Sequence, residues 1–333
     1  MRKRPVGKTG LDVTVFSMGT LSIGGDGVWG HSDEAESIRT IRRACDLGIN
    51  FFDTAAFYGF GRSETVLGKA LAQDRDKYVV STKCGLDWDT GEGSPFFERD
   101  GHSVSRDLSP KAVRRSLENS LKRLGTDHVD LCITHWQSVE PAFTPIAETM
   151  GTLLDMKREG KLRAIGASNI SLEQVKEYMK YGRLDLVQER FSMLSPVKFR
   201  ELNAFCHAND ITFHAYSTLE RGLLTGAYTM ESVIRPGDAR NEWCEWYQTQ
   251  KRRKVLDMLA SFAPFCMKYG CSQAALTIAW TLHQASNVNV DVGARRVASL
   301  EENVRGGEIR IEPEDLAAMN RAVNRLLSEE GAA

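Results

Sequence analysis

Short apolar runs alternate along this chain with longer stretches in which apolar residues recur at helical spacing. The runs are rich in β-branched and aromatic residues, which is typical of parallel strands buried on both faces. The alternation gives about eight strand–helix units, the number that closes a (β/α)8 barrel, and a doubly wound open sheet is the structural alternative. We expect strands at residues 15–20, 48–53, 78–83, 129–135, 164–169, 186–189, 211–216 and 288–292.

Capping residues predict where the intervening helices begin and end. Ser63 is expected to be the N-cap of a helix that runs to Leu71, and Ser109-Pro110 to open a helix that runs to about Leu124. Gly160 is expected to end a helix over residues 144–159. Further helices are predicted from Asp33 to Leu47 and from Ser171 onward.

Two segments interrupt the alternation. Residues 84–108 and 220–250 contain glycine, proline and aromatic residues without clear periodicity. Long irregular segments inside a compact domain are usually lids or binding loops. Because each follows a predicted strand end, we expect them to form the walls of a substrate pocket and a clasp over a cofactor.

Four polar residues lie at or just past the carboxyl ends of three predicted strands: Asp53, Tyr58, Lys83 and His135. Such positions converge in barrels. Lys83 would depress the pKa of Tyr58 by stabilising the phenolate, and Asp53 would hold Lys83 in place. His135 could orient a carbonyl oxygen or share the proton. We predict that these four residues are catalytic and that a cofactor supplies the electrons for carbonyl reduction.

The alternative for this group is purely structural, with Asp53 capping a loop and Lys83 serving as its ion-pair partner. The alignment of Tyr58 and His135 with this pair favours the catalytic interpretation. The other histidines, including His214, show no metal-ligand pattern and are expected to be ordinary surface or core residues.

Composition narrows the class of protein. The chain has 333 residues, 42% of them hydrophobic, and a formal charge of −1, which suits one large α/β domain over residues 1–333. The charged residues are scattered, so no nucleic-acid or membrane partner is indicated. No secretory signal or bilayer-spanning run is evident, so a cytoplasmic enzyme is expected. The seven cysteines have no zinc spacing, so no metal site is predicted and they are interpreted as reduced thiols.

A set of ordered motifs closely resembles the aldo-keto reductase superfamily, in particular its bacterial sugar-type and potassium-channel β-subunit-like branch. The matching segments are Asn50-Phe51-Phe52-Asp53-Thr54-Ala55, Tyr58-Gly59, Ser63-Glu64, Ser81-Thr82-Lys83, Thr134-His135-Trp136, Ile165-Gly166-Ala167-Ser168-Asn169, Gln188, Ala215-Tyr216-Ser217-Thr218-Leu219, Gly222-Leu223-Leu224-Thr225-Gly226, Gly293-Ala294-Arg295 and Glu302-Asn303. The resemblance implies a (β/α)8 TIM barrel with an N-terminal β-hairpin, extended active-site loops and an NADPH site without a Rossmann motif.

The resemblance also implies roles for individual residues. Tyr58 would be the general acid, tuned by Lys83 and Asp53, and Tyr216 would stack on the nicotinamide ring. The Ser217 to Leu224 segment would clasp the pyrophosphate. The implied cofactor-binding set is Thr20, Ser168, Asn169, Gln188, Tyr216, Ser217, Leu219, Gly222, Leu224, Gly293, Arg295, Ser299, Glu302 and Asn303.

Some positions depart from the family pattern. Gln137-Ser138 follows His135-Trp136 where sugar-type members often have Pro-Asp. Asp291-Val292 precedes Gly293 where an apolar residue followed by proline or valine is common. We expect NADP(H) to be favoured over NAD(H), through a contact of Arg295 with a ribose 2′-phosphate. Alternatively, Arg295 is a solvated residue at a helix start.

The expected substrate is an aldehyde or ketone, possibly a sugar or sugar derivative. Trp29, Trp88 and Trp136 follow strand ends and could line its pocket, or simply pack beneath the loops. Two functional alternatives stay open. One is an NAD(P)-dependent sugar dehydrogenase working in the oxidative direction, and the other is a non-catalytic cofactor-binding regulatory subunit. The oligomeric state is not predicted.

Overall fold

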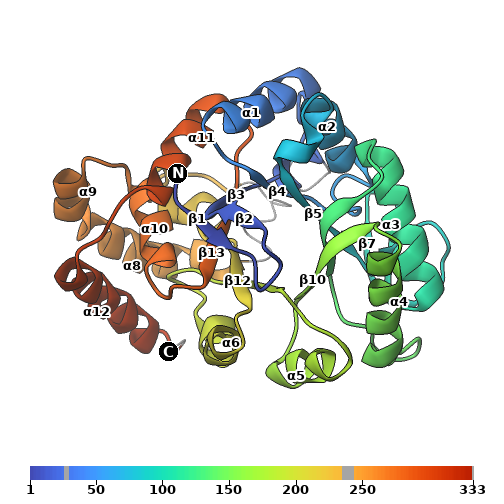
Figure 1. Cartoon of the computed structure of the whole chain (residues 1–333). Coiled ribbons are helices and arrows are strands. Elements are labelled where there is room, and N and C mark those ends of the chain that lie inside the picture. Colours follow the sequence, from blue (N-terminus) through green and yellow to red (C-terminus); the bar gives the residue numbers. More distant parts are fainter. Residues whose placement is uncertain (26–29, 235–243, 332–333) are drawn as a thin grey trace.

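The computed structural model describes residues 1–25, 30–234 and 244–331. Eight parallel strands close into a barrel, so the predicted (β/α)8 fold is confirmed, and each expected strand is present (Figure 1). Around the barrel the strands are β3 (Phe16–Gly19), β4 (Phe51–Asp53), β5 (Val79–Cys84), β9 (Val129–Thr134), β10 (Leu162–Ser168), β11 (Leu186–Arg190), β12 (Thr212–Tyr216) and β13 (Val288–Gly293).

Helices surround the barrel on its outer side (Figure 1). None of those in the described residues is both long and apolar enough to cross a membrane. The α-helices are α1 (Glu34–Asp46), α2 (Arg62–Leu71), α3 (Pro110–Leu124), α4 (Ile146–Arg158), α5 (Leu172–Tyr181), α6 (Val197–Ala208), α8 (Thr249–Ala260), α9 (Ala263–Tyr269), α10 (Gln273–Leu282), α11 (Val297–Val304) and α12 (Pro313–Glu329). Short 3₁₀ helices are η1 (Leu21–Ile23), η2 (Arg75–Lys77), η3 (Glu220–Thr225), η4 (Glu245–Tyr247) and η5 (Arg305–Gly307).

The predicted caps at Ser109 and Gly160 are present, and the one at Ser63 is wrong. Gly160, with a φ of 78°, directly follows the C-cap Glu159 of α4. The Ser109 side chain accepts a hydrogen bond from the Ala112 N–H at the start of α3, and Ser171 forms a capping box at the start of α5. Such caps stabilise a helix by about 1 kcal/mol. Ser63 instead lies inside α2, whose N-cap is Gly61 with a φ of 94°. The Ser63 hydroxyl bonds the Thr20 hydroxyl at 2.7 Å, a tertiary contact that outcompetes local capping.

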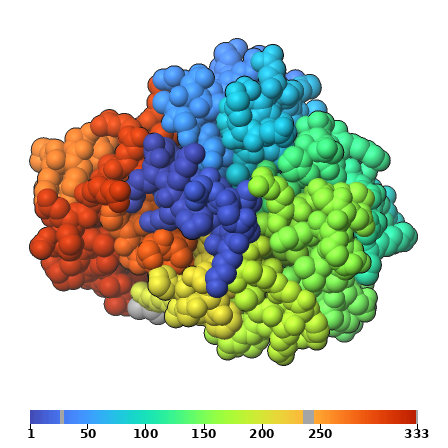
Figure 2. Space-filling model, viewed as in Figure 1, coloured from blue at the N-terminus to red at the C-terminus, as the bar shows by residue number. Residues whose placement is uncertain are grey.

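The interior of the barrel has two layers of different polarity. Near the amino ends of the strands it is apolar, with Phe51, Leu131 and Leu186 in one buried cluster. Hairpin β1 (Lys3–Pro5) and β2 (Asp12–Thr14) adds its own apolar side chains to this cluster and covers that end of the barrel (Figures 1 and 2). The expected N-terminal hairpin is thus confirmed. Towards the carboxyl ends the inward residues become polar, which places the chemistry at that end.

The segment 84–108 was expected to be irregular, and this expectation is wrong. It folds into a three-stranded antiparallel sheet of β6 (Leu86–Asp87), β8 (His102–Arg106) and β7 (Ser94–Arg99). Asp100 and Gly101, with φ of 51° and 79°, form the two-residue turn between β7 and β8. An Asp-Gly pair is a strong hairpin signal, so the sequence did contain the information.

Candidate active site

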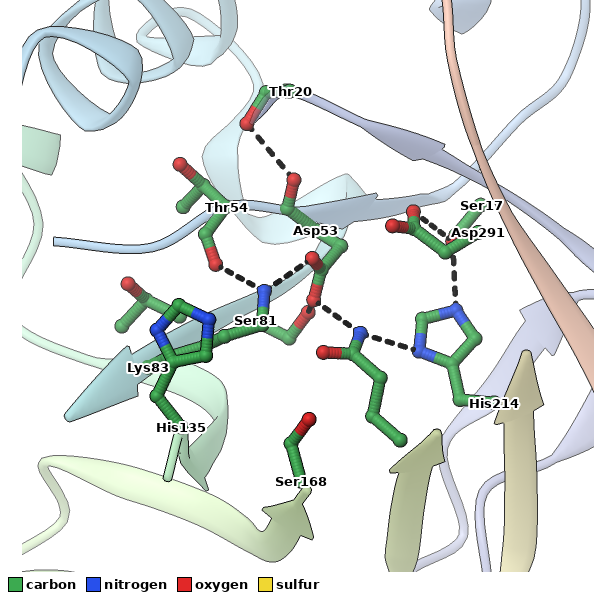
Figure 3. Close-up of polar contacts among 12 residues, drawn as sticks. Ser17, Thr20, Asp53, Thr54, Ser81, Lys83, His135, Ser168, His214 and Asp291 are labelled. Atoms are coloured by element: carbon green, nitrogen blue, oxygen red, sulfur yellow. Dashed lines mark hydrogen bonds and ion pairs between the residues drawn. The ribbon is translucent and has the colours of Figure 1, made fainter. Parts of the chain in front are cut away.

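Asp53 and Lys83 form a buried ion pair at the carboxyl ends of neighbouring strands β4 and β5. The Lys83 ammonium donates to the Asp53 carboxylate and, at 2.8 Å, to the Thr54 carbonyl oxygen. Ser81, also on β5, donates from its hydroxyl to the other Asp53 oxygen at 2.7 Å. These contacts fix the ammonium in one position (Figure 3).

The pair is ionised despite its burial. Burial raises the pKa of Asp53, but the charge of Lys83 and the hydrogen bonds from Lys83 and Ser81 outweigh it and leave that pKa below its usual value. Burial lowers the pKa of Lys83, but the Asp53 carboxylate reverses the effect and raises it above normal. A permanent positive charge therefore lies inside the barrel at neutral pH.

Tyr58 lies in the segment between β4 and α2, with the Lys83 ammonium 4.8 Å from the centre of its ring. Lys83 lowers the pKa of Tyr58, as expected, but the larger and opposite effect of burial was not foreseen. Burial raises the pKa of Tyr58 to about 12, and the Lys83 charge only reduces the size of that rise. The phenol is consequently neutral and carries its proton at physiological pH.

His135 directly follows β9, and its ring packs nearly perpendicular to the ring of Tyr58. The two ring centres are 5.8 Å apart and the planes are inclined at 80°. Burial, followed by the charge of Lys83, lowers the pKa of His135 to about 3, so the imidazole is neutral. The backbone amide of His135 donates to the Cys84 carbonyl, and its own carbonyl accepts from the Asn169 amide at 2.8 Å. The four predicted catalytic residues therefore meet in space.

A chain of hydrogen bonds that the sequence interpretation missed extends from Asp53 across the barrel (Figure 3). The Gln188 amide nitrogen donates to Asp53 and to His214 Nδ1, both at 3.0 Å. His214 Nε2 lies 2.8 Å from the Ser17 hydroxyl, which donates to Asp291 at 2.9 Å. Because an amide nitrogen can only donate, His214 carries its proton on Nε2.

Asp291, at the far end of this chain, is a second carboxyl group in the site. Burial and the negative charge of Asp53 raise the pKa of Asp291 well above its usual value, and Lys83 offsets only part of the rise. Burial likewise lowers the pKa of His214 to about 4. The sequence did contain a signal for Ser17 and Asp291. Each is a polar residue between apolar neighbours in a predicted strand, in Phe16-Ser17-Met18 and Val290-Asp291-Val292.

Several residues of the expected cofactor set gather beside His135. Asn169, after β10, donates to the Ser168 hydroxyl at 3.2 Å, and the Tyr216 hydroxyl donates to Asn169 at 2.8 Å. Thr20 donates from its hydroxyl to the Asp53 carbonyl at 2.9 Å. With Gln188 on β11, these side chains present hydroxyl, amide and aromatic groups at one end of the barrel, a donor set that fits a nicotinamide carboxamide and ring.

The remaining residues of that set lie in two segments farther along the chain. Ser217 and Gly222, with φ of 57° and 100°, bend the backbone around η3, which also contains Leu224; Leu219 immediately precedes it. Gly293 ends β13, and Arg295 and Ser299 are exposed at the start of α11. On the same helix Glu302 is exposed and Asn303 buried.

Aromatic residues adjoin Tyr58 on the side of the three-stranded sheet. Trp88 packs against Phe57, with ring centres 6.2 Å apart, and Trp136 packs against Phe96 at 5.0 Å. Phe57 lies in a buried cluster against which Tyr58, Trp88 and Trp136 all pack. Trp29 lies outside the described residues.

The thiols form no disulfide in the structure. All seven cysteines are free, and the buried Cys84 and Cys132 sulfur atoms lie 3.8 Å apart on neighbouring strands. Within the described residues no group of three or more His, Cys, Asp or Glu side chains could hold a metal ion.

The aldo/keto reductase family model matches residues 16–324, and the chain belongs to that family. The protein is therefore an oxidoreductase that depends on NAD(P)H. The chain is 40% identical to the NADH-specific methylglyoxal reductase of Escherichia coli (strain K12), over 98% of this chain and 99% of that protein. It is 33% identical to an aldo-keto reductase of Bacillus subtilis (strain 168), over 90% of this chain and 87% of that protein.

Among solved structures, the chain is similar to the glycerol dehydrogenase AKR11B4 from Gluconobacter oxydans. The TM-score is 0.87 and the identity 30%, and the match covers 99% of this chain and 96% of that one.

Proposed function

We propose that this enzyme reduces an aldehyde or ketone to an alcohol, with Tyr58 as the proton donor. The observation that carries the proposal is the buried Lys83 ammonium, which pairs with Asp53 and lies 4.8 Å from the centre of the Tyr58 ring. When bound, a reduced nicotinamide dinucleotide supplies the hydride. Ser168, Asn169 and Gln188 would hold its carboxamide, and Tyr216 would pack against its ring.

The high pKa of Tyr58 is compatible with this role. Hydride addition to a carbonyl carbon creates an alkoxide, which is a far stronger base than a phenolate, so the proton moves downhill from Tyr58 to the new alcohol. The Lys83 ammonium stabilises the phenolate that is left, and Asp53 prevents that ammonium from moving away. Neutral His135 would donate a hydrogen bond to the carbonyl oxygen and so fix its position.

The test follows the loss of NADH or NADPH absorbance with methylglyoxal, aromatic aldehydes and aldoses, with Tyr58→Phe as the matched control. We expect turnover in the wild type, at least a ~100-fold loss in the variant and an unchanged dinucleotide affinity, since the ring stays in place. A Tyr58→Phe variant with most of its turnover would refute the assignment of the acid.

For the cofactor, we propose that Arg295 at the exposed start of α11 confers a preference for NADPH through its charge. The name of the E. coli relative points the other way, towards NADH. Dissociation constants for the two reduced dinucleotides, in wild type and Arg295→Met, decide between these. A selective loss of NADPH affinity in the variant supports the preference, and equal affinities in the wild type refute it.

A second candidate function is oxidation of a polyol, which the similarity to a glycerol dehydrogenase favours. The same residues serve both directions, because Tyr58 that has lost its proton becomes the base for the reverse reaction. Production of reduced dinucleotide from glycerol and sugar alcohols tests this candidate.

A further inference from the structure

Arg106 ends strand β8 of the three-stranded sheet and lies on the aromatic cluster beside the site. Its guanidinium carbon is 3.7 Å from the centre of the Phe96 ring and 5.0 Å from that of Trp136. Trp136 is the residue after His135, whose ring centre lies 5.8 Å from that of Tyr58. Tyr58, Phe96 and Trp136 pack against the same buried cluster, so Arg106 lies on the aromatic side chains that adjoin Tyr58.

No carboxylate neutralises Arg106 among the residues that the structure describes. Other half-buried arginines nearby do have acidic partners, such as Arg115 with Asp87 and Arg123 with Glu64. Arg106 Nε is buried without a hydrogen-bond partner. Burial lowers the pKa of Arg106 and no described anion offsets the effect, although a guanidinium stays protonated at neutral pH.

An unpaired, partly desolvated guanidinium beside a predicted catalytic site is suited to bind a carboxylate. The planar guanidinium can donate two parallel hydrogen bonds to the two oxygen atoms of a carboxylate. The flat faces of Phe96 and Trp136 hold the guanidinium in place, so little conformational freedom is lost on binding.

We infer that Arg106 binds a carboxylate on the carbonyl substrate, so that the enzyme prefers oxo acids and aldehyde acids over neutral carbonyl compounds. The inference rests on the proposed reductase function. It adds to that function a specificity residue outside the predicted catalytic set.

The experiment compares two aldehydes of nearly equal shape, 4-carboxybenzaldehyde and methyl 4-formylbenzoate, in wild type, Arg106→Met and Arg106→Lys. We expect the wild type to favour the acid in kcat/KM and Arg106→Met to lose about tenfold to 100-fold on the acid alone. Arg106→Lys should recover part of the loss through its charge. Arg99→Met is the matched control, since Arg99 lies over Phe97 in the same sheet, 5.5 Å from the ring centre, and should leave the ratio unchanged.

A binding measurement separates this inference from the proposed function. Quenching of tryptophan fluorescence by benzoate needs no turnover, and we expect a weaker affinity in Arg106→Met than in Arg99→Met. Reduction of both aldehydes with the same acid-to-ester ratio in wild type and Arg106→Met would overturn the inference while leaving the reductase intact. Absence of turnover with normal Arg106-dependent benzoate binding would refute the reductase and retain the anion site.

Discussion

The Lys83 ammonium lies 4.8 Å from the centre of the Tyr58 ring and is held there by its buried ion pair with Asp53. Tyr58 nevertheless has its pKa raised to about 12, because burial of the phenol outweighs the neighbouring positive charge. In the proposed reaction the cation would therefore act after proton transfer, by stabilising the phenolate, and would not ionise the tyrosine beforehand.

Replacement of Lys83 should lower both the stability of the folded protein and the rate of the proposed reaction. In Lys83→Met, Asp53 would be a buried carboxylate without its cation, and we expect the free energy of unfolding to fall by about 3–5 kcal/mol. The double variant Asp53→Asn/Lys83→Met should recover a part of this loss, since no charge is left unpaired. Urea unfolding measures both variants, and equal stability of the single and double variants would contradict the account.

The rate of carbonyl reduction should be nearly independent of pH in the neutral range. The proposed mechanism needs protonated Tyr58 and neutral His135, whose pKa values are about 12 and about 3. Between these values neither group changes its charge, so kcat/KM for reduction should be flat from about pH 5 to about pH 9. A pH–rate profile checks this, and a fall with a midpoint near pH 7 would mean that another group donates the proton.

Asp291 should make the protein less stable as pH rises. Its pKa is raised in the folded state, so it keeps a proton that the unfolded chain loses. The folded state is then penalised by about 1.4 kcal/mol for each pH unit above the unfolded pKa, until the folded pKa is reached. Asp291→Asn, which keeps the acceptor for Ser17, should be more stable than wild type at pH 7 and equally stable at pH 3.

Thermal unfolding of wild type and Asp291→Asn at a series of pH values tests this linkage. Ser17→Ala serves as the control, because it removes the hydrogen bond to Asp291 without removing the titrating group. Parallel stability curves for wild type and Asp291→Asn would show that the carboxyl group does not titrate abnormally.

Tyr216 offers a separate test of the cofactor site. Tyr216→Phe keeps the ring and loses only the 2.8 Å hydrogen bond to Asn169, whereas Tyr216→Leu loses the ring as well. If the ring packs on the nicotinamide, we expect the dissociation constant of the dinucleotide to rise about tenfold or more in Tyr216→Leu and less than about threefold in Tyr216→Phe. Equal rises of the dissociation constant in the two variants would mean that the hydroxyl group, and not the ring, contributes the binding energy.

Much of the fold was predictable because its signals are local in the sequence. Each barrel strand is a short apolar run, and the N-caps Ser109 and Ser171 act on N–H groups three residues away. The convergence of Asp53, Lys83 and His135 was also predictable, since carboxyl ends of parallel strands meet at one end of a barrel. Ser63 failed as a cap prediction because its hydroxyl has a better partner in Thr20, which lies 43 residues away.

The sequence by itself determined the order of the barrel strands, the family and the gathering of Asp53, Lys83 and His135 at the carboxyl end of the barrel. Only the tertiary structure decided their charge states and the links between them. Whether burial or the Lys83 ammonium controls the pKa of Tyr58, and whether Ser17, His214 and Asp291 join one hydrogen-bonded chain, depends on distances between strands far apart in sequence. Desolvation and Coulomb interactions depend on those distances and on the surrounding atoms, and neither is encoded in the local pattern.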